Sequence, residues 1–230
     1  VEYTYTNAPE GATTLPVKTS YKYGATVTVA DKAASITGYT VGDWNRTGTF
    51  TMPAEKVTIS ANWTINSNRL TYLVDGAATN DSGNVVYNTA VTLPTEPTKD
   101  GYTFSGWLRD GVKAENFDMP DEAVTISGTF TANEDTEYTI ETYLQNLDGT
   151  YPTTASSSTT GHGKTDTEAT ATAETIEGFT FDADNTNNVL RGNIAGDGSL
   201  VLKLYYTRNS YDVEYTYTNA PEGATTLPVK

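Results

Sequence analysis

Apolar and polar residues alternate along several short stretches of the chain, with the two-residue period of β-strands. Val57–Ile59 and Val124–Ile126 alternate in this way, and each stretch lies shortly after a Met–Pro step. Ser199–Tyr206 shows the same alternation directly after the turn signal Asp197–Gly198. Thr, Tyr and Val, which favour strands, are abundant, whereas Leu and Met are scarce. The pattern therefore predicts an all-β or β-rich fold.

The stretch that precedes Ser199–Tyr206 is less regular. Within Tyr138–Pro152, Asp148–Gly149 separates two strand-like runs and predicts a tight hairpin. The small polar residues of Thr153–Lys164 predict a loop. Thr165–Ile176 combines Ala and Glu, which favour a helix, with Thr and strict alternation, which favour a strand. We interpret Thr165–Ile176 as a strand, with a helix as the alternative.

Two stretches of the chain resemble each other closely enough to mark an internal repeat. Ile36–Trp44, with the sequence ITGYTVGDW, is similar to Lys99–Trp107, with the sequence KDGYTFSGW. Farther on, Phe50–Trp63 is similar to Phe117–Phe130, and each contains the Met–Pro step that we expect at a strand end or tight turn. The repeat predicts two small β modules of the same kind.

A third, more divergent stretch keeps the Gly–aromatic–Thr signature of the first two. The three signature glycines are 63 and 77 residues apart. We expect each glycine to begin a strand with a positive φ or a bulge. The residues that define the signature are Gly38, Tyr39, Trp44, Gly101, Tyr102, Trp107, Gly178 and Phe179.

The aromatic residues of the signature are interpreted as core. A continuous strand from Gly38 would place Tyr39 and Val41 on one face and Trp44 on the other. The tryptophans are expected to cover one end of each core. The alternative is that Trp44 and Trp107 form a platform for a glycan ligand.

The first eighteen residues, Val1–Lys18, return without a change as Val213–Lys230, at an offset of 212 residues. Identity of this length exceeds what a strand and its turn require, so we predict a tandem array with a 212-residue period. The alternative is an artificial duplication of one end. The predicted division is a first module at 1–66, a second at 67–132, a third at 133–210 and the start of the next copy at 211–230. The linkers between modules are brief, which predicts a semi-rigid rod.

The order of these features resembles a known family. In the first and second modules, a Tyr-x3-Val run, a GYTFSGW-type segment and F-x-MP-x3-VTI are similar to the Listeria–Bacteroides repeat, also called the internalin B-repeat. In the third module, YLQNLDGTYP, GFTFD and GDGSLVLKLYYTRN are similar to mucin-binding-protein-like repeats. The resemblance implies small ubiquitin-like β-grasp modules in extracellular, wall-attached proteins of Gram-positive bacteria, with a stalk or adhesion function. It transfers no binding residue, and we expect the β-grasp helix of the second module to be reduced to a turn.

Charge and composition exclude several partners. The net charge is −15, with 14 Lys and Arg against 29 Asp and Glu, so the chain repels phosphate backbones and anionic lipid surfaces. No run approaches the ~20 apolar residues of a membrane-spanning helix. We therefore expect no nucleic-acid partner and no membrane insertion within this segment. The expected partners are neighbouring copies of the repeat, and surface glycans or proteins of a host or microbe.

The residues that most catalytic sites need are scarce in this chain. It has no Cys and a single histidine, His162, which lies between Gly161 and Gly163 and is expected in a solvated loop. A zinc site needs three or four nitrogen or sulfur ligands, which one histidine without cysteines does not supply. A catalytic nucleophile needs a base beside it, and a lone histidine between two glycines is not expected to be that base. Phosphate-binding and dinucleotide-binding glycine motifs are also absent from the sequence. We therefore expect that the chain is not an enzyme.

The sequence offers two other kinds of site as alternatives to a purely structural role. Hard oxygen ligands cluster in the sequence DADNTNN, where calcium is the alternative to a simple turn. The residues of this cluster are Asp182, Asp184, Asn185, Asn187 and Asn188. Lys203 is the lysine best placed for an intramolecular isopeptide bond, and the alternative is an outward lysine that protects an edge strand. We expect no cofactor, and calcium bound by the DADNTNN loop is the alternative.

The sequence therefore predicts a non-catalytic tandem-repeat segment of a bacterial cell-surface adhesin, stalk or fibre. One alternative is a glycan- or mucin-binding module. Another is a subunit of a non-covalent surface filament, in which the duplicated end of one chain adds a strand to the next. In each case the expected location is extracellular and attached to the cell surface or cell wall.

Overall fold

The computed structural model describes residues 1–12, 14–219 and 221–224. These residues form strands β1 to β21 and no helix, which confirms the β-rich fold. None of them therefore belongs to a helix with the length and apolar character of a membrane span. The chain divides into two compact units. Unit 1 holds Val1–Pro97 and Phe104–Phe130, and unit 2 holds Thr98–Thr103 and the described residues from Thr131 onward.

The first core of unit 1 is built on a parallel pair of strands. β1 (Glu2–Thr6) runs parallel to β5 (Thr58–Ile65), and β3 (Tyr39–Val41) is antiparallel to β5 on its other side. β2 (Thr26–Thr28) pairs with β4 (Thr49–Thr51) in a separate ribbon. The alternation predicted after the Met–Pro step is confirmed. The core residues that it contributes are Val57, Ile59, Ala61 and Trp63.

The second core of unit 1 repeats this plan. β6 (Ser67–Val74) runs parallel to β14 (Val124–Gly128), and Ile126 is completely buried beside Leu70 and Tyr72. Shorter strands complete this part of the chain. They are β7 (Ala77–Ala78), β8 (Gly83–Val86), β9 (Ala90–Val91), β10 (Tyr102–Phe104), β11 (Leu108–Arg109), β12 (Val112–Lys113), β13 (Phe117–Asp118) and β15 (Phe130–Ala132).

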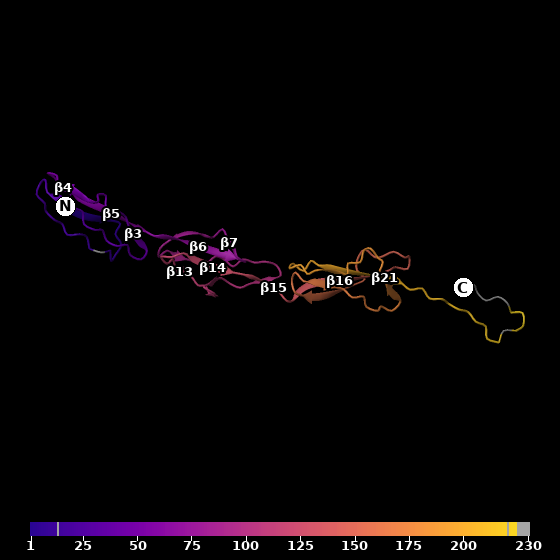
Figure 1. Ribbon diagram of the computed structural model, residues 1–230. Helices are drawn as coiled ribbons and strands as arrows, with labels where there is room; N and C mark the ends of the chain where they lie inside the picture. Colours follow the sequence, from indigo (N-terminus) through magenta and orange to yellow (C-terminus); the bar gives the residue numbers. More distant parts are fainter. Residues whose placement is uncertain (13, 220, 225–230) are drawn as a thin grey trace. The chain divides into compact units, whose positions relative to one another are not determined.

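Unit 2 contains the third core. Its sheet has the order β17-β16-β21-β19, with β16 (Thr136–Leu144) parallel to β21 (Val201–Arg208). These two strands lie side by side in Figure 1. Leu202, Leu204 and Tyr206 of β21 are buried, which confirms the strand predicted there. The other strands are β17 (Ser157–Gly163), β18 (Glu168–Thr170), β19 (Phe179–Phe181) and β20 (Arg191–Asn193).

Each core contains one long parallel pair, formed by strands that are far apart in the sequence. Parallel partners need a crossover connection, and here that connection consists of loops and short strands in the described residues. Every residue of the three cores comes from within one of the predicted modules. The boundaries of those modules stay a prediction.

The predicted loop at Thr153–Lys164 is wrong, because its second half forms β17. This strand pairs antiparallel with β16 along seven residues, from Ser157 to Gly163. Its side chains are mostly exposed, and it lies at the edge of the sheet. The backbone pairing needs no apolar alternation, so the polar sequence gave no sign of a strand. His162 therefore lies on a strand and not in a loop.

Two neighbouring predictions hold only in part. A turn forms at Asp148–Gly149, where Gly149 has a φ of 83°. The connection from β16 to β17 is nevertheless longer than a tight hairpin, because β17 begins only at Ser157. In Thr165–Ile176 only Glu168–Thr170 is a strand.

Trp44 also departs from its predicted face. β3 ends at Val41, and the chain then turns so that the amides of Gly42 and Asn45 bond carbonyl oxygens of β5. The strict two-residue alternation stops there. Val41 and Trp44 are therefore both buried in the same core.

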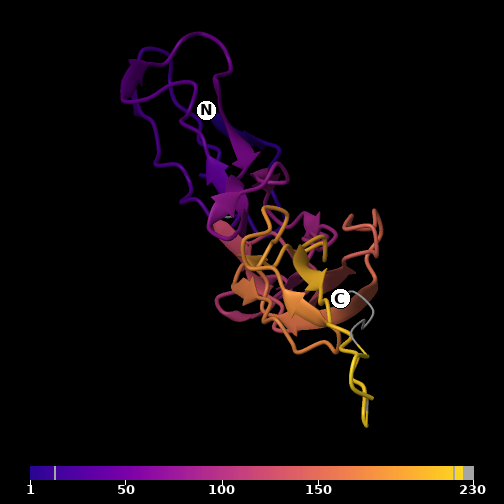
Figure 2. The same ribbon diagram turned by 90° about the vertical axis from the view of Figure 1, so that its right-hand side faces the viewer.

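The duplicated segment adopts two conformations. In the first copy, Glu2–Thr6 form β1, and Tyr3 is only 7% exposed. In the second copy, residues 213–218 form no strand, and Tyr215 is 50% exposed. The described part of this yellow segment is drawn without strand arrows after β21 in Figures 1 and 2. Residue 13 of the first copy, and residues 220 and 225–230 of the second, lie outside the described residues.

We predict that Ile126→Ala lowers the free energy of unfolding by roughly 2–5 kcal/mol, because it removes a fully buried side chain from the second core. Urea denaturation followed by far-ultraviolet circular dichroism measures this loss. Thr125→Ala is the matched control on the same strand, because Thr125 is exposed. The control is expected to cost less than about 1 kcal/mol. Equal losses for the two variants would contradict the packing described for this core.

Candidate functional site

The three signature glycines share one local structure, which we call the Gly–Asn closure. Each glycine has a positive φ, as predicted, and its carbonyl oxygen accepts a hydrogen bond from the backbone amide of an asparagine that follows a later strand. A threonine two residues after the glycine donates its hydroxyl proton to Oδ1 of the same asparagine. The sets are Gly38, Thr40 and Asn66; Gly101, Thr103 and Asn133; and Gly178, Thr180 and Asn209.

The geometry of the closure is nearly constant. The φ angles of the glycines are 79°, 76° and 76° in chain order. The amide-to-carbonyl distances are 2.8, 2.8 and 2.9 Å. The hydroxyl-to-Oδ1 distances are 2.8, 2.7 and 2.7 Å. This constancy marks the closure as the repeated structural element of the chain.

In unit 1 the first closure is joined to residues of the second core by a carboxylate. Asp121 accepts a hydrogen bond from the backbone amide of Gly38 at 2.8 Å. Its other oxygen accepts from the side-chain amides of Asn66 at 2.8 Å and Asn68 at 3.2 Å. These bonds, above all the one from Gly38, hold the pKa of Asp121 below its ordinary value of 3.8.

An aromatic contact accompanies the carboxylate. The ring of Tyr87 meets Tyr39 edge to face, with centroids 6.0 Å apart. A Cβ placed on Gly38 would overlap the Tyr87 ring, so only glycine admits this approach. We call this set of contacts the Asp121 joint. Its members are Gly38, Tyr39, Asn66, Asn68, Tyr87 and Asp121.

Within unit 2, the second closure is covered differently. The hydroxyl of Thr165 donates to the carbonyl of Gly101 at 2.8 Å, and the amide of Thr165 donates to the carbonyl of Asn133 at 3.0 Å. Thr165 is 2% exposed, and its hydroxyl also lies 2.7 Å from that of Thr136. Tyr102 is hydrogen-bonded to Asp166. Gly101 is therefore covered by polar contacts in place of an aromatic ring.

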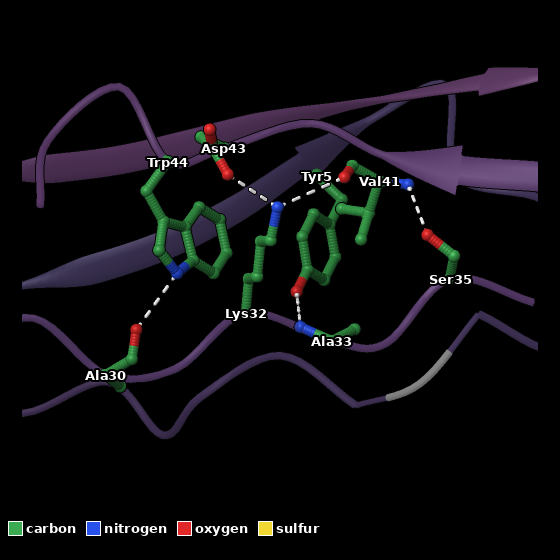
Figure 3. A network of polar contacts seen from close by, with 8 residues as sticks. All are labelled: Tyr5, Ala30, Lys32, Ala33, Ser35, Val41, Asp43 and Trp44. Atoms are coloured by element: carbon green, nitrogen blue, oxygen red, sulfur yellow. Dashed lines mark hydrogen bonds and ion pairs between the residues drawn. The ribbon is translucent and has the colours of Figure 1, made fainter.

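The first signature tryptophan belongs to the core. Trp44 stacks on Tyr5 with ring centroids 5.0 Å apart and planes 10° from parallel. Its Nε1 donates to the carbonyl of Ala30 at 2.9 Å, while the Tyr5 hydroxyl accepts from the amide of Ala33 (Figure 3). A sugar ring needs an exposed aromatic face on which to stack, and Trp44 is only 7% exposed. Packing therefore accounts for this side chain.

Trp107 has the equivalent surroundings in the second core. It meets Phe104 edge to face at 5.2 Å, and its Nε1 donates to the carbonyl of Pro94 at 2.9 Å. It is 4% exposed. In both modules the indole N–H thus fixes a loop onto the core, and neither ring presents a free face.

A shallow pocket lies beside Trp44 and is lined in part by Lys32 and Asp43. The Lys32 ammonium lies 2.6 Å from Oδ1 of Asp43 and donates to the carbonyl of Val41 at 3.3 Å, as Figure 3 shows. The bond from Lys32 lowers the pKa of Asp43. Lys32 is thus paired with Asp43, and Asp31 adds a second carboxylate to the lining, so the pocket offers no free cation.

The loop that is the alternative calcium site is held by hydrogen bonds within the protein. It lies between β19 and β20 and contains Asp182, Asp184, Asn185, Asn187 and Asn188. Three of its side-chain oxygens accept from nearby donors: Asp182 from Asn185 and Tyr151, Asn185 from Asn187, and Asn188 from the amide of Tyr205. In the described part of the chain, no group of three or more His, Cys, Asp or Glu is placed to hold a metal ion. The observed bonds are those of a turn.

The alternative given for Lys203, an outward lysine that protects an edge strand, is wrong. β21 lies between β16 and β19, so the strand is internal to its sheet. The Lys203 ammonium lies 3.9 Å from Glu141 and 5.8 Å from the centre of the Tyr143 ring. The lysine is thus held by a neighbouring carboxylate and ring. His162, on β17, lies 3.0 Å from Asp135.

Sequence reasoning missed the asparagines of the closures, although the chain carries a signal for them. Each is the last residue of an aromatic–Thr–x–Asn pattern and directly follows a strand, which is β5, β15 or β21. The three copies are Trp63–Asn66, Phe130–Asn133 and Tyr206–Asn209. Asp121 gave no such signal, because its partner Gly38 is 83 residues away.

Comparison with known proteins places the first two modules among bacterial repeat domains. Residues 1–67 match the divergent InlB B-repeat domain, and residues 69–133 match the Listeria-Bacteroides repeat domain. The repeat resemblance of these two modules is therefore confirmed.

Similar segments occur in longer proteins. Over 151 residues, 58% of this chain, the sequence is 34% identical to internalin H of Listeria monocytogenes, and the match covers 27% of that protein. Over 138 residues, 54% of this chain, it is 31% identical to a provisionally named Gly-rich membrane protein of Evansella cellulosilytica, of which it covers 16%. The matches thus span about a quarter or less of these relatives. Together they identify a repeat segment of the kind found in bacterial surface-associated proteins.

We predict that the Asp121 joint weakens in acid. The folded pKa of Asp121 is lowered, so its contribution is fully present above the ordinary value of 3.8 and is lost as the pH falls through the lower folded pKa. The chemical shift of the Gly38 amide, followed by NMR during acid titration, should change with an apparent pKa below 3.8. Asp121→Asn should remove this titration at Gly38, whereas Glu122→Gln, at the neighbouring position, should leave it in place. An unchanged titration in Asp121→Asn would show that another group is responsible.

Proposed function

We propose that this chain is a non-catalytic segment of a tandem array that serves as a stalk or fibre of a Gram-positive surface protein. The observation that carries the proposal is the unchanged return of Val1–Lys18 as Val213–Lys230. The repeat domains matched by residues 1–67 and 69–133 support it. In this role the segment projects or presents adhesive surfaces outside the cell, attached to the cell surface or wall.

The proposed period has three β-grasp-like modules, at 1–66, 67–132 and 133–210. The parallel pairs β1–β5, β6–β14 and β16–β21 support this, because each joins the first and last long strands of one core. The helix of a β-grasp would be replaced by loops and short strands. Mucin-binding-protein-like character of the third module is part of the proposal and rests on its sequence.

The mechanism we propose is mechanical. Each module buries its own apolar core, so it needs no disulfide in a chain without cysteine. Contacts at the Gly–Asn closures, of which the Asp121 joint is one form, limit bending between neighbours, which gives a semi-rigid rod. The net charge of −15 keeps neighbouring rods apart and soluble. Surface glycans or proteins of a host or microbe would then be engaged by many weak contacts along the array.

A second candidate function is favoured by the two conformations of the duplicated segment. β1 lies at the edge of its sheet, and residues 213–218 have the sequence of Val1–Thr6 without its strand partner. The second copy in one chain has the side chains to occupy the β1 position of another. Such strand addition would join short chains into a non-covalent filament.

One measurement separates these functions. The intact mass of the native polypeptide, released from the surface of its source cells and measured by mass spectrometry, is expected to exceed 24.8 kDa by many whole 212-residue periods. A native mass near 24.8 kDa would contradict the covalent array. In that case the strand-addition filament predicts that removing residues 213–230 abolishes assembly of the purified chain in light scattering.

A further inference from the structure

Tyr23 is an unusually exposed aromatic residue for a side chain held on an ordered turn. It is 80% exposed, and it precedes Gly24, which has a φ of 80°. The amide of Gly24 donates to the carbonyl of Met52 at 2.9 Å, and the amide of Met52 donates back to Ala25 at 2.8 Å. The backbone around Tyr23 is thus fixed while its ring faces solvent.

Tyr87 occupies the same structural position in the second module. It precedes Asn88, which also has a positive φ, and the amide of Asn88 donates to the carbonyl of Met119 at 2.8 Å. The amide of Met119 donates back to Thr89 at 2.9 Å. Met52 and Met119 are the methionines of the two Met–Pro steps. The role of Tyr87, which is to cover Gly38 of the preceding module, therefore indicates a role for Tyr23.

The third Gly–Asn closure presents the surface that such a ring would cover. Gly178 has the φ and the Asn209 bond of the first closure, and Phe179 follows it as Tyr39 follows Gly38. A Cβ placed on Gly178 would meet no atom of the described residues within 4 Å. At Gly38 the same test meets the ring of Tyr87. Within the described residues, the third closure thus lacks the covering that the first one has.

The number of residues between the closure asparagine and the first core tyrosine of the next module is the same after the third closure as after the first. Tyr72 of β6 lies opposite Ile126, as Tyr3 of β1 lies opposite Ile59 in the first core. Tyr72 follows Asn66 by six residues, and Tyr215, the copy of Tyr3, follows Asn209 by six residues. A module that begins at Val213 therefore starts at the same chain distance from its closure as the second module does.

We propose that Tyr23 docks on the Gly178–Phe179 backbone of the preceding copy of this chain, and so joins one 212-residue period to the next. The partner is the first module that begins at Val213, so the inference rests on the proposed tandem array. The incoming ring covers Gly178 as Tyr87 covers Gly38. The Arg208 guanidinium already lies 4.6 Å from the centre of the Phe179 ring, so the new contact is mainly with the glycine backbone.

The proposed contact between Tyr23 and Gly178–Phe179, which we call the period joint, differs from the Asp121 joint in its hydrogen bonds. Ala54 follows Met52–Pro53 where Asp121 follows Met119–Pro120. The carboxylate that accepts from the glycine amide is therefore missing between periods. The period joint consequently depends on Tyr23 more strongly than the Asp121 joint depends on Tyr87, and it has no counterpart of the acid-sensitive Asp121 contact.

The test uses a chain of two complete periods with two spin labels. The native sequence has no cysteine, so Ser158→Cys in the third module of the first period and Thr26→Cys in the first module of the second period are labelled specifically. Both sites are exposed. Pulsed electron–electron double resonance then measures the distance distribution across the period joint. We expect a single narrow distribution.

The matched variants place the same change on either side of the joint. Tyr23→Ser in the second period removes the docking ring and should broaden the distribution. Tyr23→Ser in the first period changes an identical residue that has no preceding copy in this chain, and it should leave the distribution narrow. A broad distribution in the unchanged two-period chain, or no response to the change in the second period, would overturn the docking. These results do not depend on the native mass, so failure of the docking and failure of the array are distinguished.

Discussion

A left-handed glycine held by an asparagine amide closes each of the three cores in this chain. A positive φ costs other L-residues about 1–2 kcal/mol, so the position selects glycine before any neighbour is considered. The carbonyl of Gly38 is then bonded by Asn66, and its amide points to Asp121. The missing Cβ also leaves room for the Tyr87 ring. Gly38 thus forms a backbone hydrogen bond within its own module, and it also leaves room for the contacts from the next module.

The duplicated segment shows how much of the strand structure depends on a partner. The same residues are a paired, half-buried strand as Glu2–Thr6, beside β5, and an exposed segment without strand pairing at 214–218. Local preference is identical in the two copies, so the difference arises from the presence or absence of a parallel neighbour. Burial of Tyr3 and pairing with Ile59 supply the stabilisation that the second copy lacks in the described residues.

The sequence was most informative where alternation coincides with burial. Ile126 and Leu202 lie on strands whose apolar positions recur every second residue, so both the strands and their core residues were predictable. β17 was not, because an exposed edge strand is held by backbone bonds that polar residues satisfy equally well. Trp44 changed faces because the strand stopped at Val41, and the endpoint of a strand is set by tertiary bonds to β5.

In the candidate site, the glycines were predictable from the sequence, whereas their hydrogen-bond partners were not. The glycines stood out through the Gly–aromatic–Thr signature, and their positive φ followed from glycine itself. Their partners are side chains and amides from distant parts of the chain, and a single asparagine or aspartate in a polar stretch is indistinguishable from a solvated one. The aromatic–Thr–x–Asn pattern at Trp63–Asn66 becomes meaningful only when it is seen three times in register with the closures.

We infer that the first and second modules are joined through the closure at Gly38 and do not move independently. Nitrogen-15 relaxation of the whole chain tests this directly for residues 1–66 and 67–132, which belong to one compact unit except for Thr98–Thr103 and Thr131–Ala132. The account predicts that amides in β5 and β14 report one common rotational diffusion tensor. It also predicts that combined removal of the Asp121 carboxylate and the Tyr87 ring separates the two. Independent tumbling of β5 and β14 in the unchanged chain would contradict the account.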